Sequence, residues 1–77
     1  MALIVKINKG EIPHTWKTSF TYAGETQDLL GRMFPLKKGN PKTLTEYINF
    51  RVHQKRRKLP ISIVIPDQYL KELIQIP

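Results

Sequence analysis

The sequence predicts a small α+β domain in which an antiparallel sheet of about four strands carries two short helices. Some segments alternate apolar and polar residues with the period of two that is typical of strands, and others space apolar residues as helices do. Glycine and proline separate these segments. With 77 residues, 40% of them apolar, the chain is expected to form one globular domain over residues 1–77. The expected element order is ββαββα.

The first two elements are predicted to form an antiparallel hairpin. Residues 3–7 are β-branched and apolar, and the turn residues 8–10 end the run. Residues 14–23 then alternate, with Trp16, Phe20 and Tyr22 on one face. In so small a domain these rings are needed for the interior, so this aromatic face is expected to be core rather than a platform for stacking bases.

A short helix is predicted after Gly24. Thr26 can cap it, and Leu29, Leu30, Met33 and Phe34 would share one apolar face before Pro35 ends the helix. Gly31 inside the helix counts against this prediction, since glycine costs about 1 kcal/mol there relative to alanine.

Residues 43–53 allow two interpretations. As a helix, Thr43 and Glu46 have the spacing of a capping box, and Leu44, Tyr47, Ile48 and Val52 form one face. As a strand, Ile48, Phe50 and Val52 alternate with polar residues. The strand is favoured because the helix leaves Phe50 off its apolar face, although residues 44–57 can also be a helix.

The last part of the chain predicts a strand followed by a helix. Residues 61–65 form an apolar run between Pro60 and Pro66. Asp67 can cap a final helix, whose apolar side would consist of Tyr69, Leu70, Leu73 and Ile74.

The positive charge of the chain is concentrated in residues 37–58. This window holds eight cations against Glu46 alone, which accounts for the whole net charge of +7. If residues 45–53 and 61–65 were adjacent strands, residues 54–58 would form the tip of their hairpin. Four consecutive cations at such a tip would repel one another unless a polyanion neutralised them.

The sequence therefore predicts a small nucleic-acid-binding protein, regulatory or accessory in role, that contacts phosphates of DNA or RNA. The main contacts are expected from the basic cluster at 55–58, with flanking lysines at 37–42. The predicted contact residues are Lys37, Lys38, Lys42, Arg51, Lys55, Arg56, Arg57 and Lys58. The alternative is a non-enzymatic interaction module or inhibitor that docks an acidic protein surface, or that pairs through an exposed strand edge.

Other classes of function are not indicated. There is no cysteine, the two histidines are far apart, and the six acidic residues are scattered, so neither a metal site nor catalysis is expected. No cofactor motif and no apolar run long enough for a membrane span occurs. The protein is expected to be a cytoplasmic non-enzyme, and its oligomeric state stays open.

Overall fold

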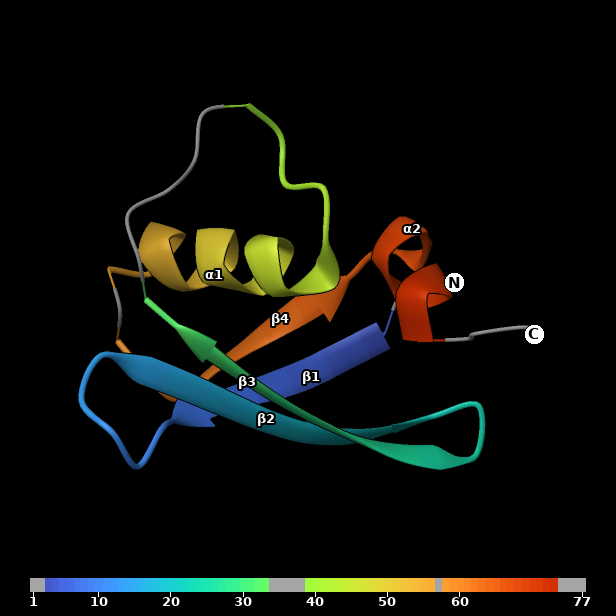
Figure 1. Ribbon diagram of the computed structural model, residues 1–77, viewed down its shortest axis with the longest axis horizontal. Coiled ribbons are helices and arrows are strands. Elements are labelled where there is room, and N and C mark those ends of the chain that lie inside the picture. The colour runs from blue at the N-terminus through green and yellow to red at the C-terminus, as the bar shows by residue number, and fades with distance from the viewer. Residues whose placement is uncertain (1–2, 34–38, 57, 74–77) are drawn as a thin grey trace.

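The computed structural model of the chain describes residues 3–33, 39–56 and 58–73, and it has the predicted α+β class (Figure 1). Four strands form one antiparallel sheet, accompanied by two short helices. The elements are β1 (Leu3–Lys9), β2 (Thr15–Tyr22), β3 (Glu25–Arg32), α1 (Leu44–Gln54), β4 (Ile61–Ile65) and α2 (Asp67–Leu70), with a single 3-10 turn, Lys71–Leu73, after α2.

The sheet has the strand order β3-β2-β1-β4. The predicted β1–β2 hairpin is confirmed, and β2 continues through a tight turn into β3, with Tyr22 opposite Glu25. The final strand then crosses to the other side of β1, where Leu3 lies opposite Ile65. Both β3 and β4 are therefore edge strands.

The helices cover one face of this sheet and leave the other face open (Figure 1). The core between the two layers takes alternate residues of the strands and one side of α1. Its fully buried members include Ile7, Trp16, Ile48, Val52 and Ile65. Phe20 and Tyr22 are half-buried against this core, so the expectation that the aromatic face of β2 is interior is confirmed.

The helix predicted after Gly24 is wrong, because these residues form β3. A helix would place Leu29 and Leu30 on one face, but neighbouring side chains of a strand point to opposite faces. Accordingly Leu29 packs against the core, whereas Leu30 is 75% exposed. Phe34 lies outside the described residues.

Gly31, which counted against a helix, has a packing role in the strand. It lies directly opposite Trp16, and the indole occupies the space that a Cβ at Gly31 would take. An aromatic ring that covers a strand glycine in this way shields the backbone that the missing side chain would expose.

The strand favoured for residues 43–53 is also wrong, and the alternative helix is the observed structure. Both halves of the capping box are present: the Glu46 amide donates to Thr43 Oγ1, and the Thr43 amide donates to the Glu46 carboxylate. Leu44, Ile48 and Val52 are buried one turn apart. Phe50, the residue that favoured a strand, is only half-buried. The observed order is thus βββαβα.

The predictions for the last part of the chain are confirmed in outline. The strand over residues 61–65 has the predicted bounds. The final helix begins at Asp67, but Pro66 is its N-cap, so Asp67 lies in the first turn instead of capping it. Tyr69 and Leu70 are buried as predicted, and Ile74 lies outside the described residues.

Candidate nucleic-acid interface

One end of the molecule collects the ends of five elements. Because the sheet is fully antiparallel, β1 and β3 finish at the end where β2 and β4 begin. The first half of helix α1 lies near the far end of β4, where the Tyr47 hydroxyl donates to the Val64 carbonyl at 3.1 Å. The C-terminus of α1 therefore lies at the same end of the molecule as the start of β4. Figure 1 shows the β1–β2 loop, the end of β3 and the end of α1 together on the left.

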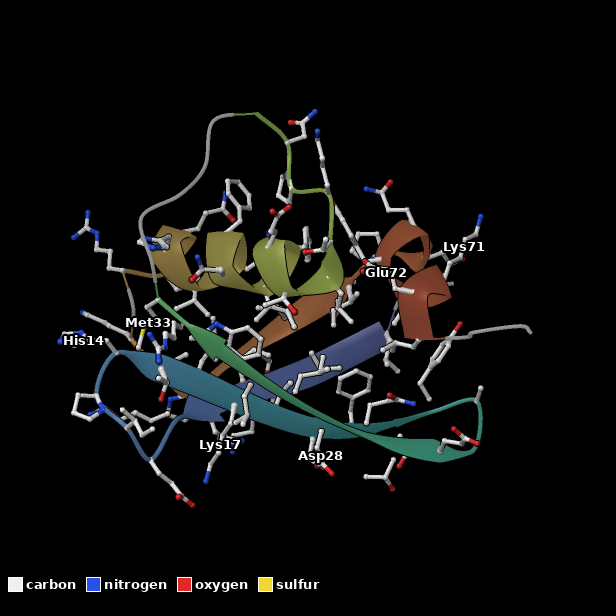
Figure 2. The ribbon with its side chains drawn as sticks, in the orientation of Figure 1. His14, Lys17, Asp28, Met33, Lys71 and Glu72 are labelled. Carbon is white, nitrogen blue, oxygen red and sulfur yellow. The ribbon has the colours of Figure 1, made fainter. Side chains whose placement is uncertain are left out.

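This convergence gathers positive charge from segments that are distant in sequence. Among the described residues it brings together six cations, here called the basic end: Lys9, Arg32, Arg51, Lys55, Arg56 and Lys58. Glu11 is the acidic residue of the described chain at this end, where the net charge is therefore +5. His14 also lies here, at the β1–β2 loop (Figure 2).

Among the described residues, those at the opposite end of the molecule are mainly acidic. The β2–β3 turn, the start of α1, helix α2 and the 3-10 turn after it carry Glu25, Glu46, Asp67 and Glu72 there, against Lys42 and Lys71. The charge is thus polarised along the strand direction. A polyanion would be attracted to one end and repelled by the other.

The predicted hairpin tip at residues 54–58 is wrong, because the segment before it is the helix α1, Leu44–Gln54, and not a strand. Lys55 is the C-cap of α1, and Arg56 follows with φ 56°, in the left-handed region. The Arg56 amide donates to the His53 carbonyl at 2.9 Å, a bond of the Schellman type. The carbonyls at a helix C-terminus carry partial negative charge, which stabilises adjacent cations by about 0.3–1 kcal/mol each.

Arg56 occupies a position that favours glycine. A residue with a Cβ costs roughly 1–2 kcal/mol in the left-handed conformation. The chain nevertheless holds a long, exposed guanidinium there. Strain of this kind at a single residue is often found where the side chain has a function.

The predicted contact residues fall into three groups. Lys55, Arg56 and Lys58 are exposed and adjacent, and Arg51 lies half-buried in the last turn of the same helix. Lys42 is also exposed, but it precedes α1 and is ~20 Å from Lys55 at 1.5 Å per residue, so the structure does not bring it to the same surface. Lys37, Lys38 and Arg57 lie outside the described residues.

Sequence reasoning missed Lys9 and Arg32 as members of this group. Arg32 is the last residue of β3, which was predicted to be a helix, and it lies opposite Thr15 at the start of β2. A correct assignment of β3 as the strand after β2 would have placed it at this end.

The open face of the sheet carries no aromatic side chain within the described strands. The rings of β2 point to the helix side, and Trp16 is 0% exposed. Stacking of unpaired bases on this face is therefore not available, in contrast to sheets that bind single strands through exposed rings.

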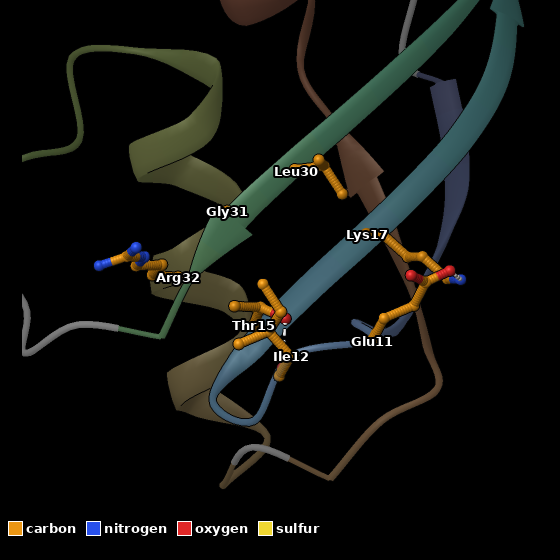
Figure 3. Close-up of a pocket in the computed structure, with 7 residues that line it drawn as sticks. All are labelled: Glu11, Ile12, Thr15, Lys17, Leu30, Gly31 and Arg32. Atoms are coloured by element: carbon orange, nitrogen blue, oxygen red, sulfur yellow. Dashed lines mark hydrogen bonds and ion pairs between the residues drawn. The ribbon is translucent and has the colours of Figure 1, made fainter.

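A shallow hollow of about 470 Å³ lies on the open face beside the basic end (Figure 3). Ile12 and Leu30, which are 69% and 75% exposed, make its apolar part. Lys17 and Glu11 approach each other at 3.8 Å on its rim, and the Thr15 hydroxyl donates to the Ile12 carbonyl within it. The hollow therefore holds one weak, exposed ion pair and mainly apolar surface.

Comparison with family models, with curated proteins and with solved structures found no match. Among the described residues, no three histidine, aspartate or glutamate side chains are grouped so that they could hold a metal ion. In the same part of the chain, no helix has the length and apolar character needed to cross a membrane.

Proposed function

We propose that this protein binds nucleic acid through the basic end, by contacts to backbone phosphates. The observation that supports this most is the convergence of six cations from the ends of β1, β3 and α1 and from the segment before β4. Phosphate binding releases condensed counterions, so a surface of this kind binds without reading sequence.

Stabilisation of α1 is the simplest alternative explanation for these cations. One or two positive side chains suffice to complement the C-terminus of a helix, and the effect falls off within its last turn. Lys9 and Arg32 come from strands, and Lys58 follows α1 by four residues. The excess over what the helix needs favours an external polyanion.

Duplex nucleic acid is the favoured ligand. The open sheet face lacks exposed rings among the described residues, and the cations sit on the ends of elements rather than along a groove lined with aromatics. Such a surface fits the regular phosphate rows of a duplex better than splayed single-stranded bases.

The test is fluorescence anisotropy with labelled duplex DNA, duplex RNA and single-stranded DNA at about 50 and 200 mM salt. With four phosphate contacts, affinity for duplex DNA should fall about 150-fold between these two conditions. The triple variant Lys55→Ala/Arg56→Ala/Lys58→Ala should lose most binding and flatten the salt dependence by about one unit of slope for each cation removed.

A matched control removes the same charge elsewhere. Lys6→Ala/Lys42→Ala/Lys71→Ala also lowers the net charge by three, but Lys6 lies on the open face, and Lys42 and Lys71 lie at the acidic end. Equal losses in the two triple variants would mean that total charge, and not the basic end, attracts the ligand. Absence of binding to all three nucleic acids at 50 mM salt would overturn the proposal, and binding to a polyglutamate peptide instead would favour an acidic protein partner.

Arg56→Gly separates function from stability. Glycine relieves the left-handed strain, so the free energy of unfolding of this variant should rise by about 0.5–1 kcal/mol, while its affinity for nucleic acid falls. Ala23→Gly is the control, because Ala23 has a similar φ of 53° but lies in the turn at the acidic end. It should raise stability and leave binding unchanged.

A further inference from the structure

We propose that the edge of β3 left unpaired in the described sheet pairs with β3 of a second copy of this chain, forming a two-fold dimer with one continuous sheet. This inference shares Arg32 with the basic end, but it is argued from the strand edge and does not depend on nucleic-acid binding.

The edge at β4 is short and partly occupied. β4 has five residues, is bounded by Pro60 and Pro66, and its Val64 carbonyl accepts a hydrogen bond from Tyr47. Prolines and short length are among the features by which proteins protect sheet edges. β3 has eight residues, contains no proline, and ends the described sheet on the other side.

The hydrogen-bond pattern shows which residues of β3 face outward. The Met33 amide donates to the His14 carbonyl, so Met33 points toward β2. Backbone groups alternate along a strand, and the β2–β3 register is unbroken from residue 25 to residue 32. The amide and carbonyl of Leu30, and those of Asp28, therefore point away from the sheet.

One register makes this edge complementary to itself. A two-fold axis perpendicular to the sheet at Leu30 places Leu30 opposite the Leu30 of the second copy, and Asp28 opposite its Arg32, twice. All three side chains lie on the open face, where Leu30 is 75% exposed. An apolar pair between two opposite-charge pairs is a favourable cross-strand arrangement.

The neighbouring registers are less favourable. An axis at Asp28 sets two like charges directly opposite each other, and an axis at Leu29 sets Asp28 opposite Leu30. The charges on β3 therefore select the axis at Leu30. The same axis keeps both copies of α1 on one side of an eight-stranded sheet.

Charge-reversal variants test both the dimer and its register. Sedimentation of the unmodified chain over about 10–500 µM should show a rising mass that approaches the dimer. Asp28→Arg alone, and Arg32→Asp alone, should each weaken self-association about tenfold or more, because each puts two like-charge pairs across the axis. An equimolar mixture of these two variants should associate about as well as the unmodified chain, since a dimer with one copy of each variant again has two opposite-charge pairs across the axis.

Results that overturn the proposal are equally definite. A monomer over the whole concentration range excludes the dimer. Self-association that the single variants do not weaken, or that mixing them does not restore, excludes this edge and register. Circular dichroism of each variant establishes that it is folded before its mass is interpreted.

A cross-link gives a second measurement. The chain has no cysteine, so Leu30→Cys introduces a single thiol at the axis. The Cα atoms of a hydrogen-bonded antiparallel pair are about 5.5 Å apart, a distance that a disulfide can span. Mild oxidation should yield a covalent dimer at least about tenfold faster than for Thr21→Cys, an exposed position on the inner strand β2. Equal rates for the two variants would contradict pairing at this edge.

Discussion

Replacing Gly31 with alanine is expected to destabilise the protein, although the backbone favours alanine. Gly31 has no positive φ and lies inside β3, where glycine is usually less stable than alanine by about 0.5–1 kcal/mol. Judged by the backbone alone, the substitution would raise stability. Packing against Trp16 predicts the opposite sign.

The size of the effect follows from three distances. A Cβ at position 31 would lie 2.2 Å from Cζ2 of Trp16, 2.3 Å from Cε2 and 2.7 Å from Nε1. Carbon atoms normally approach to about 3.5–4.0 Å, so the ring must move by more than about 1 Å. Trp16 is fully buried and cannot rotate into solvent. Overpacking of this degree costs about 3 kcal/mol, which leaves a net loss of about 2 kcal/mol and lowers the melting temperature by roughly 8–16 °C.

Tryptophan fluorescence is the natural assay, because Trp16 is the only tryptophan and lies in the core. Urea unfolding should be measured for the unmodified chain, Gly31→Ala, Trp16→Phe and the double variant, with circular dichroism as the probe where Trp16 is absent. In the Trp16→Phe background the cost of Gly31→Ala should shrink by at least about 1 kcal/mol. Equal costs in both backgrounds, or a more stable Gly31→Ala protein, would refute the packing argument.

Two further substitutions probe local structure. Thr43→Ala removes the threonine side chain from the capping box and should lower the free energy of unfolding by about 1 kcal/mol. Thr45 is exposed in the first turn of α1, so Thr45→Ala should change this free energy by less than about 0.5 kcal/mol. Urea unfolding of the two variants measures the difference. Ala23→Asn should raise the melting temperature by a few degrees. Ala23 and Gly24 both have positive φ, and asparagine followed by glycine is favoured in such a two-residue turn. A thermal scan that shows no increase would contradict this assignment of the turn.

The sequence predicts the fold class and the number of elements, but it assigns the wrong type to two of them. β3 was predicted to be a helix, and α1 was predicted to be a strand. Segments whose pattern is unambiguous, such as the alternating β2 and the proline-bounded β4, agree with the structure. The two errors arise where one short apolar pattern fits both periods. Adjacent Leu29 and Leu30 resemble a helical face, and their division between two sides of a sheet depends on β2, which local sequence does not include.

For residues 43–53 the deciding information is local. The capping spacing of Thr43 and Glu46 is visible in the sequence, and the two hydrogen bonds that it forms are present. The position of Phe50 favours a strand only weakly, because a half-buried ring at the margin of a helix is compatible with both periods. Hydrogen bonds that start a helix are better indicators here than one apolar side chain off its face.

The candidate site could be predicted only in part. Lys55, Arg56 and Lys58 are adjacent in sequence, so their grouping needed no fold. Their association with Lys9 and Arg32, and their separation from Lys42, depend on strand direction and on the helix between them. The strain at Arg56 is a property of the backbone and has no signal in the sequence.

The pairing of β1 with β4 has a consequence for synthesis on the ribosome. It joins residues 7 and 61, and residues 3 and 65, so roughly 55 positions or more separate the partners. Closing such a loop costs about 2 kcal/mol more than closing the four-residue turn of a hairpin. β1 leaves the ribosome before the other described elements, yet it acquires its second neighbour only after residue 65 has been made. Until then one edge of this apolar strand lacks a partner, and the nascent sheet is most vulnerable to aggregation just before β4 emerges.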